Sequence, residues 1–163
     1  VNMADLKNFI SPFFLNDKEV KKVIELIFFS YRDFTAGPDK ILEKLNFGRA
    51  HHRVIYFVGK KNNITIKELL GVLKITKQSL SRVLNQLVKE RFIVVSTGLD
   101  KRTKTLSLTK NGIILENKLS NIQISKIKNV INNFSHEDIN GFKKILFEMI
   151  EIDNKKTFQK LNE

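Results

Sequence analysis

The sequence predicts a mainly α-helical fold with one small β-hairpin. Apolar residues recur at helical spacing along most of the chain, and only after Phe92 does the spacing change to two, with β-branched residues over 93–97 and alternation over 103–108. The 163 residues include 42% apolar residues, seven glycines and two prolines, which is enough material for one hydrophobic core. We therefore expect a single domain.

The first predicted helix covers residues 16–35. Asn16 can cap it, and Glu19 follows at the spacing of a capping box. A Gly-Pro pair at 37–38 is predicted to end this helix, because both residues interrupt helical patterns. Two more helices are predicted before residue 60, over 39–45 and 49–59, the second of them deeply packed.

A helix-turn-helix is predicted in the following segment. Thr65 and Glu68 have the T-x-x-E form that opens a helix, here over 66–73. Thr76 is placed to cap a second helix over 77–91. Only two residues separate the first helix from Thr76, which is typical of the short joint in this motif.

The hairpin and two closing helices complete the pattern. The hairpin turn is predicted over 98–102. Thr109 can cap a helix rich in apolar positions, and Ser135 with Asp138 starts a last helix that carries apolar residues through Ile152. This order of elements predicts a winged helix-turn-helix with helical extensions on both sides.

The second helix of the helix-turn-helix has two different faces. On a wheel of about 100° per residue, one face is apolar (Leu80, Val83, Leu84, Leu87 and Val88) and the other is polar (Gln78, Arg82, Asn85 and Lys89). Arg and Lys side chains suit guanine edges in a major groove, and Asn and Gln suit adenine. An ordinary solvated face is the alternative, but this face carries no Asp or Glu before Glu90, which favours DNA binding.

Positive charge concentrates in the same region. The chain has a formal net charge of +12, and residues 65–110 contain ten basic and three acidic residues. At the hairpin tip, Asp100 can orient Arg102 for insertion into a minor groove. Lys101 and Lys104 are expected to contact phosphates, which gives affinity without sequence information. A solvated surface hairpin with a salt bridge is the alternative.

Three motifs occur together between residues 45 and 115. They are the helix-turn-helix, the D-x-R of the hairpin (Asp100 and Arg102) and a closing L-T-x-x-G (Leu108, Thr109 and Gly112). Together they resemble the MarR family of bacterial transcription regulators, and the runs FGRAHHRVIYFVG and LKITKQSLSRVL are similar to its PetP-like subgroup.

The resemblance implies a homodimer in which N- and C-terminal helices of two chains interleave and two winged helices face DNA. It divides the single domain of residues 1–163 into N-terminal dimerisation helices (1–47), the winged helix-turn-helix (48–112) and C-terminal dimerisation helices (113–163). Apolar surface at 9–14 and 142–158 also predicts contact with a second chain. Packing of these segments into one larger core is the alternative.

Several functional classes are excluded by composition. The absence of cysteine excludes disulfides, thiolate metal sites and thiol redox sensing. Adjacent His51 and His52 point about 100° apart on a helix, so no metal site is expected. No catalytic motif occurs, so neither an enzyme nor a cofactor is expected. No apolar run is long enough to span a membrane and no signal peptide is evident, so a cytoplasmic location is expected.

The sequence thus predicts a transcriptional regulator that binds a pseudo-palindromic operator in double-stranded DNA as a homodimer. The residues expected at base edges are Gln78, Ser81, Arg82 and Asn85, with Thr76, Lys77 and Lys89 at the DNA backbone, and with Asp100, Lys101, Arg102 and Lys104 on the wing. The resemblance further implies a small-molecule effector near Arg32, Arg49, His51 and His52. A protein-docking module and a non-specific nucleoid-associated DNA-binding protein are the alternatives.

Overall fold

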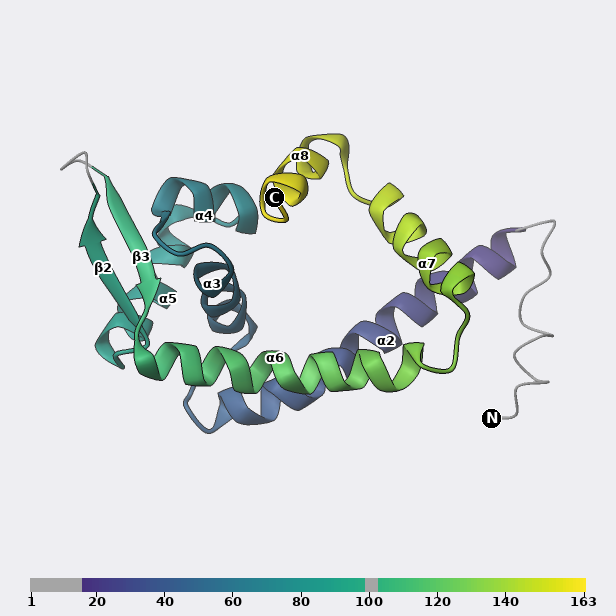
Figure 1. Cartoon of the computed structure of the whole chain (residues 1–163), viewed down its shortest axis with the longest axis horizontal. Helices are drawn as coiled ribbons and strands as arrows, with labels where there is room; N and C mark the ends of the chain where they lie inside the picture. Colours follow the sequence, from purple (N-terminus) through teal and green to yellow (C-terminus); the bar gives the residue numbers. More distant parts are fainter. Residues whose placement is uncertain (1–15, 99–102) are drawn as a thin grey trace. The chain divides into compact units, whose positions relative to one another are not determined.

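The computed structural model describes residues 16–98 and 103–163. Contacts within the chain divide it into two compact units, Val1–Ala36 and Gly37–Glu163. The described elements, in chain order, are α2 (Asp17–Glu43), α3 (Arg49–Lys60), β1 (Ile64–Thr65), α4 (Ile66–Leu73), α5 (Lys77–Lys89), β2 (Ile93–Thr97), β3 (Lys104–Leu108), α6 (Lys110–Ile131), α7 (His136–Glu148) and α8 (Ile152–Lys160) (Figure 1). The predicted mainly α class with a small sheet is confirmed.

Helix α2 is continuous from Asp17 to Glu43, so two predictions are wrong: that this helix ends at the Gly-Pro pair, and that a separate helix covers 39–45. Pro38 has no N–H and therefore removes one helical hydrogen bond. Packing compensates for this loss, because Pro38 is fully buried. A Cβ atom at Gly37 would lie 2.6 Å from Ile122 Cγ2, so the backbone approaches α6 closely here.

The start of α2 is capped as predicted. Asn16 Oδ1 accepts hydrogen bonds from the backbone N–H groups of Lys18 and Glu19, both at 3.1 Å. The Glu19 carboxylate pairs with Lys22 Nζ at 2.8 Å. Apolar side chains of this first unit are exposed, including Ile24, Leu26, Ile27 and Phe28.

The helix-turn-helix of α4 and α5 forms as predicted. Thr65 Oγ1 accepts the N–H of Glu68, and the Glu68 carboxylate accepts the N–H of Thr65 in return, which completes the capping box. Helix α4 ends at Lys74 in a left-handed conformation (φ 52°, ψ 39°), which turns the chain sharply. Thr76 then caps α5.

The sheet has three strands in the order β1-β3-β2, one more than the sequence predicts. Strands β2 and β3 form the predicted antiparallel hairpin, with Thr97 opposite Lys104 at its distal end. The additional strand, β1, places Ile64 opposite Leu106. Two residues are too few to show an alternating pattern, so only pairing with a distant segment reveals this strand.

The core of the second unit forms around α3. Val54, Ile55 and Val58 of this helix are buried. They belong to one cluster with Leu42, Phe47, Ile64, Leu69, Leu80, Val83, Leu84, Leu87, Ile93, Leu106, Leu115 and Leu119. Full burial of such a side chain stabilises a fold by about 1.5–3 kcal/mol. The cluster therefore holds α5 firmly by its apolar face.

The L-T-x-x-G motif joins the end of α5 to the start of α6. Thr109 donates its hydroxyl to the Arg91 carbonyl at 2.6 Å and its N–H to the Phe92 carbonyl at 3.0 Å. Its hydroxyl oxygen also accepts the N–H of Gly112, which caps α6. A Cβ at Gly112 would lie 2.1 Å from the Phe92 carbonyl oxygen, so only glycine permits this approach.

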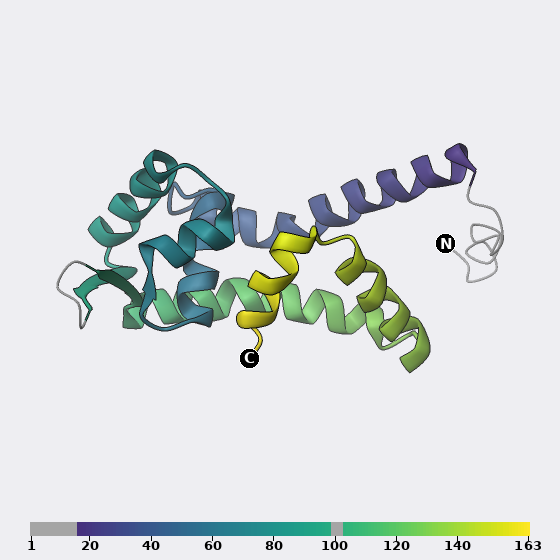
Figure 2. The same ribbon diagram turned by 90° about the horizontal axis from the view of Figure 1, so that it is seen from above.

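The C-terminal segment forms two helices where the sequence predicts one, because the chain breaks between α7 and α8 at residues 149–151. In both views the β2-β3 hairpin lies at one end of α6 and α7 at the other (Figures 1 and 2). No residue of α7 is buried within the described chain, and its apolar side chains include Phe142, Ile145 and Leu146. Among the described residues, no helix is long and apolar enough to cross a membrane.

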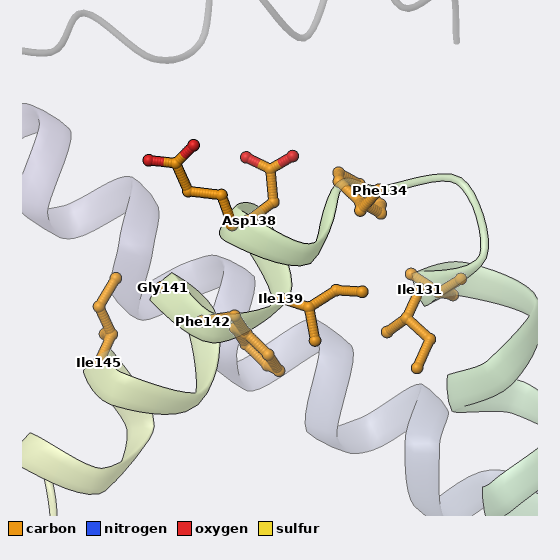
Figure 3. Close-up of a pocket in the computed structure, with 9 residues that line it drawn as sticks. Ile131, Phe134, Asp138, Ile139, Gly141, Phe142 and Ile145 are labelled. Carbon is orange, nitrogen blue, oxygen red and sulfur yellow. The ribbon is translucent and has the colours of Figure 1, made fainter.

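Two of the cavities in the described part of the chain lie beside these helices. One of about 560 Å³ lies between the last turn of α6 and the first turns of α7, and apolar side chains such as Ile131, Ile139 and Phe142 line it (Figure 3). A second, of about 400 Å³, lies where the end of α2 meets the start of α6, with Phe92 and Ile114 in its wall.

Candidate nucleic-acid interface

Helix α5 separates apolar from polar side chains as the sequence predicts. Leu80, Val83, Leu84 and Leu87 are buried, whereas Val88, also predicted on the apolar face, is 38% exposed. Every predicted contact residue of this helix is exposed, namely Lys77, Gln78, Ser81, Arg82, Asn85 and Lys89. The structure therefore brings these six together on one helix, whose opposite side is fixed in the core.

Thr76 is exposed, but its hydroxyl already has a structural task. Its Oγ1 accepts the N–H of Ser79 at 3.2 Å and donates to Ser79 Oγ at 2.9 Å. These bonds fix the first turn of α5, which carries Lys77 and Gln78. Thr76 thus stabilises the start of α5 through these two hydrogen bonds.

The charge of the interface is not compensated from within. Among the described residues, no ion pair involves Lys77, Arg82 or Lys89. The acidic residue of α4, Glu68, pairs with residues outside α5. Hydrogen bonds from the Lys61 ammonium and from the N–H and hydroxyl of Thr65 lower its pKa to about 2. The cations of α5 therefore remain available to an anionic partner.

The wing contributes one predicted contact residue to the described structure. Lys104 is exposed at the first position of β3, paired with Thr97. The other three predicted wing residues, Asp100, Lys101 and Arg102, lie outside the described residues.

The sequence prediction missed Gln86. This side chain is half-buried and forms hydrogen bonds with His51 and with the carbonyl of Asn46. The available signal was its position on the helical wheel, at about 40° from Arg82 and beside the apolar face. Its partners lie 35 and 40 positions earlier in the sequence.

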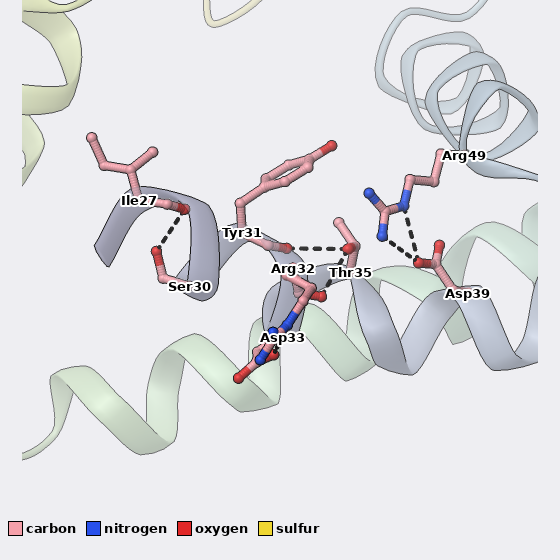
Figure 4. A network of polar contacts seen from close by, with 8 residues as sticks. All are labelled: Ile27, Ser30, Tyr31, Arg32, Asp33, Thr35, Asp39 and Arg49. Carbon is pink, nitrogen blue, oxygen red and sulfur yellow. Dashed lines mark hydrogen bonds and ion pairs between the residues drawn. The ribbon is translucent and has the colours of Figure 1, made fainter. Parts of the chain in front are cut away.

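Arg32, Arg49 and His51, all predicted near an effector, each form hydrogen bonds within the chain. Arg49 donates Nε and Nη2 to Asp39 Oδ2 at 3.0 and 2.8 Å (Figure 4). Arg32 pairs with the adjacent Asp33 at 2.9 Å, also drawn in Figure 4.

The two histidines differ in their surroundings. His51 uses both ring nitrogens in hydrogen bonds. Burial lowers the pKa of His52. The charge of Arg53 lowers it further, whereas the charges of Asp39 and Glu116 partly offset this by raising it. Among the described residues, none of the four predicted effector residues lines either cavity.

Comparisons with known proteins agree with this architecture. The MarR family model matches residues 45–103. The chain is 38% identical over 151 residues to the HTH-type transcriptional regulator PetP of Rhodobacter capsulatus, covering 92% of this chain and 91% of that protein.

Solved structures share the fold. FabT of Streptococcus pneumoniae in complex with DNA has a TM-score of 0.71 at 19% identity, covering 80% of this chain and 94% of FabT. The S. aureus MepR-DNA complex has a TM-score of 0.60 at 18% identity, covering 83% of this chain and 97% of MepR.

Proposed function

The chain belongs to the MarR family of transcriptional regulators, and we propose on this premise that it binds a specific operator in double-stranded DNA as a homodimer. Members of this family are regulators rather than enzymes. One observation carries the proposal: α5 exposes amide, guanidinium and ammonium groups on one side while the core holds its other side. Such side chains suit hydrogen bonding to base edges in the major groove.

Individual roles follow from the chemistry of each side chain. Gln78, Ser81, Arg82 and Asn85 read base edges, and Thr76, Lys77 and Lys89 contact the DNA backbone. On the wing, Arg102 enters the minor groove with Asp100 orienting it, and Lys101 and Lys104 contact phosphates. The complexes of FabT and MepR with DNA support a DNA-binding role for this fold.

Exposed apolar surface supports the homodimer. Phe142 and Ile145 of α7 are 58% and 63% exposed, and Ile152 of α8 is 78% exposed. Apolar surface that continues over neighbouring helices marks a contact with another chain. A two-fold dimer would place its recognition helices about 34 Å apart, so the operator is a pseudo-palindrome with half-sites about one helical turn apart.

A small-molecule effector completes the proposal. The family resemblance supports one, with Arg32, Arg49, His51 and His52 as the residues proposed nearby. The cavity of about 400 Å³ beside Phe92 also has room for a small molecule.

Selection of bound sequences from a random duplex pool, at two salt concentrations, tests the function. Phosphate attraction weakens with salt whereas base reading selects sequences, so the two concentrations separate them. We expect a two-fold symmetric motif that is still enriched at the higher salt. Binding without enrichment would indicate a non-specific DNA-binding protein, and no binding at either salt would favour a protein-docking module.

A further inference from the structure

Gln86 differs from the exposed polar residues of α5 because its side chain points into the protein. It is half-buried, and both ends of its amide are used. Oε1 lies 2.9 Å from His51 Nε2, and Nε2 donates to the Asn46 carbonyl at 3.2 Å. The first contact joins α5 to the start of α3, and the second joins it to the connection before α3.

Three hydrogen bonds and the backbone between Asn46 and Gly48 together close a ring. The N–H of Gly48 donates to His51 Nδ1 at 3.1 Å, so a neutral imidazole carries its proton on Nε2 and donates it to Gln86. Gln86 in turn donates to Asn46, two residues before Gly48. The ring therefore begins and ends in the same short connection between α2 and α3, and each donor in it meets an acceptor.

Aromatic packing holds that connection in place. The His51 ring stacks on Phe47, with 4.7 Å between centroids and 6° between planes. Phe47 is only 5% exposed, and its ring also meets Phe92 edge to face at 5.5 Å. Phe92 lies three residues after Lys89, the last residue of α5, so the connection contacts both the helix and the segment that follows it.

We infer that Gln86 and His51 are positioning residues that set the rotation of α5 for reading DNA. Apolar packing is non-directional and tolerates small rotations of a helix, whereas hydrogen bonds fix direction. Gln86 lies one turn after Arg82, about 40° away around the axis. By fixing the rotation of α5 about its axis, Gln86 therefore also sets the direction in which the Arg82 side chain points. This inference rests on the proposed function.

Two substitutions test it in the full-length protein. Gln86→Met keeps the length of the side chain and removes both amide hydrogen bonds. His51→Phe keeps an aromatic ring against Phe47 and removes both nitrogens. The probes are the duplex recovered from the random pool and a scrambled duplex of the same length and composition.

We expect each variant to lose about five- to tenfold in affinity for the selected duplex, the effect of about one hydrogen bond of 1 to 1.4 kcal/mol. Affinity for the scrambled duplex and its salt dependence should not change, because the phosphate contacts remain. The double variant should lose about as much affinity as either single variant, and not the sum of the two losses, since both substitutions break the same ring.

Two controls separate positioning from general destabilisation. Ser107→Ala removes a side-chain hydrogen bond to Asn63 away from α5, and Ile64→Val lowers stability through the core. Both should bind the selected duplex like the wild type at a temperature well below unfolding. If Ile64→Val lost as much specific affinity as Gln86→Met, the hydrogen-bonded ring through Gln86 would stabilise the fold without positioning α5.

The outcomes distinguish this inference from the proposed function. A wild-type protein that does not distinguish the two duplexes would overturn both. A wild-type protein that distinguishes them, with variants that do so equally well, would overturn only the positioning role.

Discussion

Arg82 carries the most specific chemistry of the proposed interface. Its side chain is exposed in the middle of α5, and a bidentate contact to guanine is the commonest specific base contact that arginine makes. Arg82→Ala should weaken binding to the selected duplex by about 1–3 kcal/mol and affect the scrambled duplex less. Titration of a labelled duplex by fluorescence anisotropy measures both. Equal losses on the two duplexes would show that Arg82 contacts phosphate instead, and Lys60→Ala at the exposed end of α3 serves as a control for lost charge.

Gly112 allows the start of α6 to pack closely against the Phe92 carbonyl because it has no Cβ. Gly112→Ala would place a Cβ 2.1 Å from the Phe92 carbonyl oxygen, so the backbone must shift. We expect a loss of about 1–3 kcal/mol in the free energy of unfolding, as for other overpacked sites. Gly71→Ala in α4 is the matched control, because no heavy atom lies within 4 Å of its added Cβ. Urea unfolding should show that variant to be as stable as the wild type or more stable.

Helix α4 begins with a capping box whose charge can be tested by pH. The folded protein holds the pKa of Glu68 at about 2, below the ordinary value of 4.5. A lowered pKa adds stability above pH 4.5 that is lost as the pH falls from 4.5 towards 2. Because Glu68 is 44% exposed, solvent limits the contribution to about 1 kcal/mol or less.

Glu68→Gln isolates this charge, since Gln can still occupy the third position of a capping box. The variant should be less stable than the wild type at pH 7, and the difference should disappear near pH 2. Thermal unfolding across this pH range measures it. A difference that stays constant with pH would mean that the charge contributes nothing, and Glu90→Gln controls for loss of a carboxylate elsewhere.

The elements that sequence analysis predicted correctly are those specified by neighbouring residues. The caps at Thr65, Thr76, Thr109 and Ser135 each use a side chain three residues from its partner, so their spacing is visible in the sequence. The failures depend on distant residues. Burial of Pro38 keeps α2 continuous, and pairing with β3 creates β1.

The candidate site divides in the same way. The exposed face of α5 follows from the helical period alone, so its six contact residues could be predicted. The contacts of Gln86 with His51 and Asn46 could not, because only the packing of α3 beside α5 brings them together. A helical wheel identifies a boundary position but not what lies across the boundary.

The whole molecule leaves apolar surface without a covering partner in the described chain. Ile145 of α7 is 63% exposed and lines the larger cavity. Ile145→Glu places a charge there, which cannot be buried against a second chain without a large desolvation cost. We expect the wild type to have twice the chain mass of 18.9 kDa in light scattering, and the variant to shift towards a single chain.

Val94→Glu is the matched control for that experiment. Val94 is 45% exposed on β2, at the other end of α6 from α7. The same charge there should leave the mass unchanged. A wild-type protein with the mass of one chain would contradict the homodimer, and an unchanged mass for Ile145→Glu would exclude α7 from its interface.

The junction between α5 and α6 has a consequence for how such regulators diverge. Thr109 and Gly112 engage the carbonyl oxygens of Arg91 and Phe92, and every amino acid supplies a carbonyl oxygen. None of the described hydrogen bonds at this junction involves Gln78, Ser81, Arg82 or Asn85. Mutations at those four positions can therefore accumulate after a gene duplication without loosening the joint. A duplicated copy can acquire a new target sequence while its fold remains intact.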